Sequence, residues 1–167
     1  MEGDGSASLE SGKGEGAMRF DKLAVLAIFF AIASIIPAIA AIAADQDFKI
    51  VINETNRTSS ISKRDVSRCF MKQTNTWISG QPVVPVDQAA SSETRQAFSV
   101  AIHNRDVSAV KSYWQREIFS GRGVPPAEKA SDQEVLAFVR ANPGAVGYVS
   151  VDAEVGEGVR VLAITDL

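Results

Sequence analysis

Apolar and polar positions follow one another in short blocks that predict strands and helices in mixed order. Phe48–Ile52 is a β-branched run followed by a polar turn, which predicts a strand. Pro82–Val86 predicts a second strand, and its two prolines place it at a sheet edge or limit it to brief pairing. Ala145–Val151 and Val159–Ile164 predict the last two strands, which are joined by an acidic turn containing glycine.

Four other segments predict helices, because their apolar residues recur three or four positions apart and each begins with a capping signal. These segments begin near Ser62, Glu93, Asp106 and Ser131. The third carries an apolar stripe of Val107, Val110, Trp114 and Ile118. The resulting order, β-α-β-α-α-α-β-β, predicts one compact α/β domain over residues 45–167.

Residues 18–44 have the pattern of a secretory signal peptide, with a short basic start followed by an uncharged apolar run. Pro37 breaks that run, and Ala41-Ile42-Ala43 is a small-residue cleavage site, so we expect the mature chain to begin near Ala44 or Asp45. Ala38-Ile39-Ala40 is the second candidate cleavage site. The alternative is an uncleaved membrane anchor, because the 22 residues of Leu23–Ala44 are long enough to span a bilayer.

Residues 1–17 are rich in glycine, serine and acidic side chains. This composition predicts either a disordered segment or residues that precede the true start at Met18. In both cases we expect the folded part to be exported, either as a periplasmic or secreted protein or held at the membrane.

The composition of the exported part excludes several classes of function. Its 123 residues carry 14 basic and 15 acidic side chains, so it lacks the clustered positive charge of a nucleic-acid-binding protein. The chain has one cysteine and one histidine, which exclude an intramolecular disulfide and a Cys-rich zinc site.

The sequence shows no pattern of residues that would form a nucleophile–base pair or a metal cluster for catalysis. His103 has no other His or Cys at metal-binding spacing, and we interpret it as a surface or capping residue. Cys69 falls on the apolar face of its helix and is interpreted as a small buried hydrophobe. The sequence therefore predicts a protein that is not an enzyme and that needs no metal or cofactor.

Anion binding is the chemistry that the sequence motivates best. Thr58–Ser62 and Ser91–Arg95 are rich in hydroxyl side chains and precede or open predicted helices, where backbone N–H groups are free. Such groups can surround an oxyanion of the size of phosphate. Simple helix capping by the same Ser and Thr residues is the alternative.

The order of these pieces resembles the substrate-binding proteins of phosphate ABC transporters. Ser92-Glu-Thr94-Arg95-Gln-Ala-Phe98 is similar to their S-G-T-R-x-x-F motif, and Trp77–Val86 is similar to their W…G-x-P-I-x-P-V run. Asn142–Val149 is similar to their P-G-A-I-G-Y-V ending. The resemblance covers almost all of Phe48–Val161, about half the length of a two-lobed binding protein. It implies part of a type II periplasmic-binding-protein fold in a short, single-domain version.

The resemblance also implies a ligand and a site. Ser92, Thr94 and Arg95 match the positions that hold the oxyanion in this family, and Ser59 and Ser60 are candidate partners from the first loop. The implied ligand is phosphate or a similar small oxyanion, and the implied partner is a membrane transporter or sensor.

Two residues depart from the family pattern at this site. Glu93 stands where the motif has glycine, and Asp87 stands where an arginine is expected after the P-V pair. Two carboxylates beside an anion would repel it in a desolvated pocket. We therefore expect any bound anion to require that Glu93 turn toward solvent.

A second hypothesis is a non-catalytic interaction module that has kept the fold and lost the ligand. Tyr113, Trp114 and Phe119 would then form an exposed aromatic patch for a partner protein. The alternative arrangement packs Trp114 in the core together with Val107, Val110 and Ile118.

Overall fold

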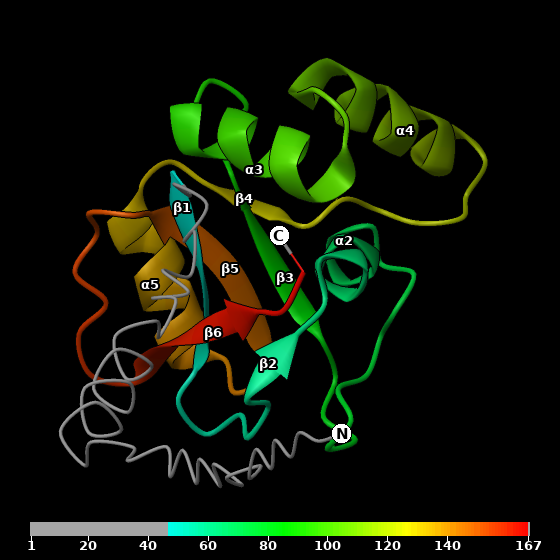
Figure 1. Ribbon diagram of the computed structural model, residues 1–167. Helices are drawn as coiled ribbons and strands as arrows, with labels where there is room; N and C mark the ends of the chain where they lie inside the picture. The colour runs from blue at the N-terminus through cyan, green and yellow to red at the C-terminus, as the bar shows by residue number, and fades with distance from the viewer. Residues whose placement is uncertain (1–46, 167) are drawn as a thin grey trace, which may run out of the picture. The chain divides into compact units, whose positions relative to one another are not determined.

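The computed structural model describes residues 47–166, so the predicted signal peptide at 18–44 and the segment 1–17 lie outside the described residues. The described part is a mixed α/β domain of one six-stranded sheet and four helices (Figure 1). Its strands are β1 (Phe48–Asn53), β2 (Ser60–Ile61), β3 (Val84–Gln88), β4 (Ala127–Lys129), β5 (Ala145–Ser150) and β6 (Val159–Ile164). Its helices are α2 (Lys63–Phe70), α3 (Glu93–His103), α4 (Val107–Phe119) and α5 (Asp132–Ala141). Within this part of the chain no helix has the length and hydropathy of a membrane span.

The sheet has the strand order β2-β6-β1-β5-β3-β4. β1 lies near its centre and runs antiparallel to both β5 and β6, with Ile50 opposite Tyr148 on one side and Leu162 on the other. β3 runs parallel to β5 and to β4, so the end of β3 lies beside the short edge strand. This arrangement brings the end of β3 and the start of α3 together with residues of β4.

Helices cover both faces of the sheet and divide the core into two main clusters. α2 and α3 lie over one face, where Ile50, Phe98 and Tyr148 are buried together, and α5 covers the other face, where Val51 and Val139 are buried (Figure 1). Because both faces of β1 are covered, its strand is apolar at consecutive positions rather than at alternate ones. The predicted α/β class is confirmed.

The predicted helix starts at Ser62, Asp106 and Ser131 are confirmed by their cap geometry. Ser62 Oγ accepts a hydrogen bond from the Asp65 N–H at 3.1 Å. Asp106 Oδ1 accepts from the Ala109 N–H at 2.7 Å. These side chains satisfy backbone donors that have no partner within the helix, which is why the sequence signal was reliable.

The second predicted strand differs from its expectation. β3 begins two residues later than predicted and lies inside the sheet, so the edge position is wrong. Brief pairing is what the prolines impose, because only Val84 and Pro85 are in register with β5. β2 and β4 were not predicted, since strands of two and three residues leave no hydrophobic pattern.

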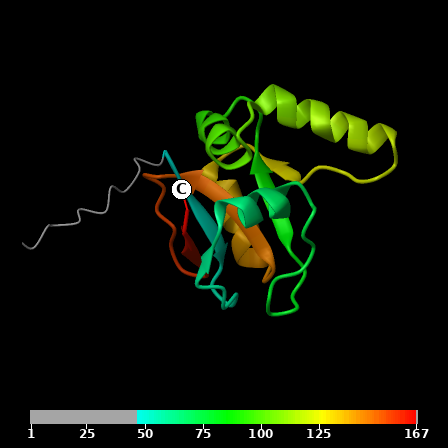
Figure 2. The same cartoon turned by 45° about the vertical axis from the view of Figure 1, so that its right-hand side comes forward.

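Helix α4 lies outside α3, on the side away from the sheet, and extends past it (Figures 1 and 2). Trp114 is buried against Met71 and Val110, so the predicted exposed patch of Tyr113, Trp114 and Phe119 is wrong at Trp114. Of the three neighbours that the alternative named for Trp114, only Val110 belongs to its cluster. The predicted stripe does not continue to Ile118, which is half exposed, and Phe119 is almost fully exposed. The last turn of α4 has no layer to pack against, and this is why the stripe stops.

Candidate functional site

The N-terminus of α3 carries three of the five predicted anion ligands, Ser92, Thr94 and Arg95. Ser92 is the N-cap, and its Oγ accepts a hydrogen bond from the Arg95 N–H at 3.2 Å. The same hydroxyl donates to Oε1 of Gln88 at 2.6 Å. Thr94 is partly exposed in the first turn, and Glu93 is exposed. The Ser92 side chain is therefore already engaged in both directions.

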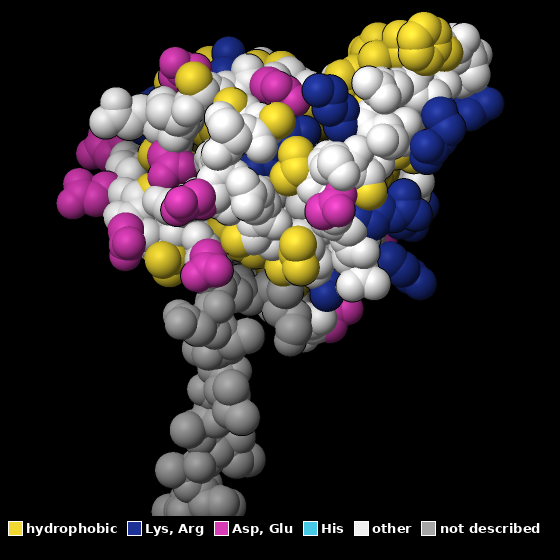
Figure 3. Space-filling model, turned by 90° about the horizontal axis from the view of Figure 1, so that it is seen from above, with side chains coloured by type: hydrophobic (Ala, Val, Ile, Leu, Met, Phe, Trp, Pro, Cys, Tyr) yellow, Lys and Arg dark blue, Asp and Glu magenta, His cyan; other side chains and the backbone are white. Residues whose placement is uncertain are grey.

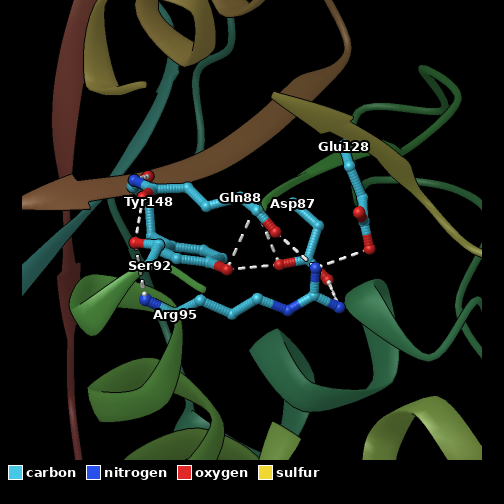
Figure 4. A network of polar contacts seen from close by, with 6 residues as sticks. All are labelled: Asp87, Gln88, Ser92, Arg95, Glu128 and Tyr148. Carbon is cyan, nitrogen blue, oxygen red and sulfur yellow. Dashed lines mark hydrogen bonds and ion pairs between the residues drawn. The ribbon is translucent and has the colours of Figure 1, made fainter. Parts of the chain in front are cut away.

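Arg95 points into the protein rather than toward solvent, with 4% of its surface exposed. Its Nη2 lies 3.0 Å from Oδ2 of Asp87, and its Nη1 lies 2.6 Å from Oε1 of Glu128 (Figure 4). Nη1 also donates to the backbone oxygen of Gln88. The guanidinium thus lies between two carboxylates of the same chain. These carboxylates provide the negative charge that an oxyanion would bring.

Asp87 is buried at the end of β3 and is held from several sides. Its Oδ1 accepts hydrogen bonds from the Tyr148 hydroxyl and from the Gln88 N–H. Burial raises the pKa of Asp87 above its ordinary range, and the charge of Arg95 and the two hydrogen bonds oppose that rise. Tyr148 is itself fixed, because its ring stacks on Phe98 with centroids 3.9 Å apart. These contacts hold the carboxylate of Asp87 in a fixed position beside Arg95.

Gln88 links this cluster to the opposite face of the sheet. Its Nε2 donates to Oδ1 of Asp132 at 2.7 Å, and Asp132 accepts a hydrogen bond from the Ser150 hydroxyl at 2.6 Å. Neither Gln88 nor Glu128 has a sequence signal that marks it as part of the cluster. Tyr148 lies in the motif that resembles P-G-A-I-G-Y-V, which was the one available indication.

Ser59 and Ser60 line a surface hollow that is separate from the cluster around Arg95. Both are exposed and line a hollow of about 350 Å³ together with Arg57, Ile78 and other loop residues. No residue of α3 is among the residues that line it. The structure thus brings Ser92 and Arg95 together at the start of α3 and places the two first-loop serines on a different surface.

Cys69 and His103, the two other residues discussed in the sequence analysis, both lie in contact with the protein interior. Cys69 is buried as predicted, and burial raises the pKa of its thiol to about 11. His103 is partly buried rather than on the surface, which corrects the prediction; its Nδ1 lies 2.9 Å from Ser67 Oγ. Burial and the charges of Arg105 and Arg95 lower the pKa of His103 to about 4, so the imidazole is neutral at physiological pH. Among residues 47–166 no three His, Cys, Asp or Glu side chains are grouped so that they could hold a metal ion.

Comparisons with known proteins identify the fold. No model of a known protein family matches the chain, and no curated protein matches it. An ABC-type phosphate transport receptor from Vibrio cholerae is similar in structure, with a TM-score of 0.55 and 18% identity over 70% of this chain and 45% of that one. A putative phosphate ABC transporter substrate-binding protein with bound phosphate, from Clostridium perfringens, has a TM-score of 0.51 and 16% identity over 72% of this chain and 44% of that one.

A possible phosphate-binding protein from Planctomyces limnophilus is also similar, with a TM-score of 0.54 and 16% identity over 72% of this chain and 42% of that one. The chain therefore spans less than half the length of the solved structures that it resembles. At these identities the likeness shows the fold alone: the domain has an α/β fold similar to part of the fold of these proteins.

Proposed function

We propose that this chain is an exported, non-catalytic interaction module that has kept part of the solute-binding-protein fold and has lost the oxyanion at the N-terminus of α3. The observation that carries the proposal is the buried ion pair between Arg95 and Asp87, at 3.0 Å, with both side chains at least nine-tenths buried. The arginine that the family resemblance assigns to the anion already has an internal carboxylate. Export is supported by the signal-peptide pattern at residues 18–44.

The proposed interaction involves a protein partner of the transporter or sensor class that the resemblance implies. Phe119 and Ile118, at the end of α4, present apolar surface to solvent, as does Ile78 in the loop before β3. Figure 3 shows hydrophobic side chains gathered at the exposed end of α4. Aromatic residues, phenylalanine among them, are enriched in protein interfaces, so Phe119 is the main anchor that this surface offers.

Phosphate binding at the same place is the second candidate function, and two observations favour it. The Clostridium perfringens structure, which has the same partial fold, contains bound phosphate. In addition, Nε of Arg95 is buried and has no hydrogen-bond partner among the described residues. An anion that displaced Asp87 or Glu128 would find this donor available.

A site-resolved phosphate titration separates the two candidates. We expect the backbone amide resonances of Ser92, Thr94 and Arg95 to stay in place when phosphate is added to the ¹⁵N-labelled chain at constant ionic strength. The Glu93→Gly variant, which restores the family motif, should behave in the same way, because Asp87 still neutralises Arg95. Saturable movement of these three resonances in either protein would instead establish the anion site and reject the proposal.

A further inference from the structure

A second polar hollow lies at the other end of α3, between that end, α2 and α4. Its volume is about 410 Å³. The lining residues that carry the argument are Ser67, Gln73, His103, Arg105, Tyr113, Arg116 and Glu117. Ser92 and Arg95 belong to the first turn of α3, whereas His103 is its last residue, so this hollow is separate from the site described above.

The lining of the hollow carries more positive than negative charge, with Arg105 and Arg116 against Glu117. The pKa of Glu117 is lowered by its hydrogen bond to Arg122 and also by the charges of Arg122 and Arg116. Among residues 47–166, the ion pairs involve Arg68, Arg95 and Arg122, and neither Arg105 nor Arg116 has a carboxylate partner. The one acidic residue of the lining, Glu117, is already engaged, because its two oxygens accept from Nε and Nη2 of Arg122 at 3.2 and 2.8 Å. Two guanidinium groups therefore remain available to an incoming anion.

The surrounding surface strengthens this charge. Residues 63–122, which contain α2, α3 and α4, carry nine basic and five acidic side chains. Residues 123–166 carry three basic and seven acidic side chains. Figure 3 shows the same separation, with Lys and Arg gathered toward the side of α4 and most Asp and Glu on the opposite side. A field of this sign concentrates anions at the hollow.

Neutral donors line the hollow beside the two arginines. Gln73 offers an amide, and Tyr113 offers a hydroxyl. Ser67 Oγ and His103 Nδ1 are 2.9 Å apart, which fixes the orientation of the imidazole. Two guanidinium groups with several uncharged donors form a set suited to the oxygens of phosphate or of paired carboxylates.

We propose that this hollow binds a small anion carrying two or more negative charges, held by Arg105 and Arg116 and oriented by Ser67, Gln73 and His103. This proposal is independent of the proposed function, because it involves other residues at the opposite end of α3. Phosphate and citrate represent the two forms that such an anion can take, a compact oxyanion and a polycarboxylate.

The test is a titration of the ¹⁵N-labelled chain with phosphate, citrate, acetate and chloride at matched ionic strength. We expect phosphate or citrate to move the amide resonances of Gln73, His103 and Arg105 saturably, and acetate and chloride to leave them in place. The only imidazole of the chain gives a second readout. Its pKa, which burial, Arg105 and Arg95 hold at about 4, should rise when a multivalent anion lies beside it.

Matched variants identify the residues responsible. Arg116→Gln should weaken binding of the effective anion by at least about tenfold, since a charge-assisted hydrogen-bonding partner is lost. Arg64→Gln removes an exposed arginine of α2 that does not line the hollow, and should leave the affinity unchanged. Equal responses to all four anions, or equal losses in the two variants, would overturn the proposal. If only the amide resonances of Ser92–Arg95 move, the anion binds at the N-terminus of α3. That result would overturn the anion site proposed for this hollow, and it would also reject the proposed function.

Discussion

Replacing Arg95 by glutamine is expected to lower the free energy of unfolding by about 3–5 kcal/mol, because removal of one member of a buried ion pair leaves an unpaired buried charge. Asp87 would be that charge, in a position where 7% of its surface reaches solvent. Urea unfolding followed by tryptophan fluorescence measures the effect. A ligand-binding arginine that faced an open pocket would give a much smaller loss.

Glu128→Gln is the matched control for this variant. Glu128 also pairs with Arg95, at 2.6 Å, but half of its side chain is exposed to water. Exposed pairs contribute about 0–1 kcal/mol, so we expect a loss within that range. Asp87→Asn combined with Arg95→Gln should cost less than the sum of the two single changes, since the charges depend on each other. Losses of similar size in Arg95→Gln and Glu128→Gln would contradict the account of a buried pair.

Gly144→Ala is expected to destabilise the domain by about 3 kcal/mol or more, at the upper end of the cost of overpacking. A Cβ on Gly144 would overlap the backbone oxygen of Pro82. That backbone cannot move freely, because the Val84 N–H donates to the Gly144 oxygen at 3.0 Å and Trp77 Nε1 donates to it at 2.9 Å. Thermal and urea unfolding of the purified variant measure the loss.

Gly123→Ala provides the comparison for this glycine. The nearest atom to its added Cβ is in the Trp114 ring, at 3.8 Å, which is ordinary contact. We expect a change within about 1 kcal/mol, since the added methyl group meets no backbone. Equal effects in Gly123→Ala and Gly144→Ala would show that the close approach of Pro82 and Gly144 does not constrain the fold.

Hydrophobic periodicity predicted most of the fold because most elements bury a continuous face. The alternation and runs of apolar residues in β1 and β5 follow directly from burial against helices on both faces of the sheet. The resemblance to the P-G-A-I-G-Y-V motif was also informative, and the structure gives a packing reason for its glycines. A Cβ on Gly147 would lie 2.7 Å from Val135 Cγ1, so only glycine lets α5 approach β5.

The candidate site was harder to predict, because its key contacts join distant segments. Asp87 could be identified as a departure from the family pattern, but its distance from Arg95 depends on how the end of β3 faces the first turn of α3. Glu128 comes from a three-residue strand that leaves no pattern in the sequence. A sequence motif reports which residue types occur along a turn. It does not show which side chains from other strands already pair with the residues of that turn.

A crystal structure of the chain grown at high phosphate concentration tests the central claim most directly. The account predicts that the Asp87 carboxylate stays in contact with the Arg95 guanidinium, as it does at 3.0 Å here, and that no phosphate lies within hydrogen-bond distance of Ser92, Thr94 or Arg95. A phosphate bound to these three residues, with Asp87 displaced from Arg95, would contradict it.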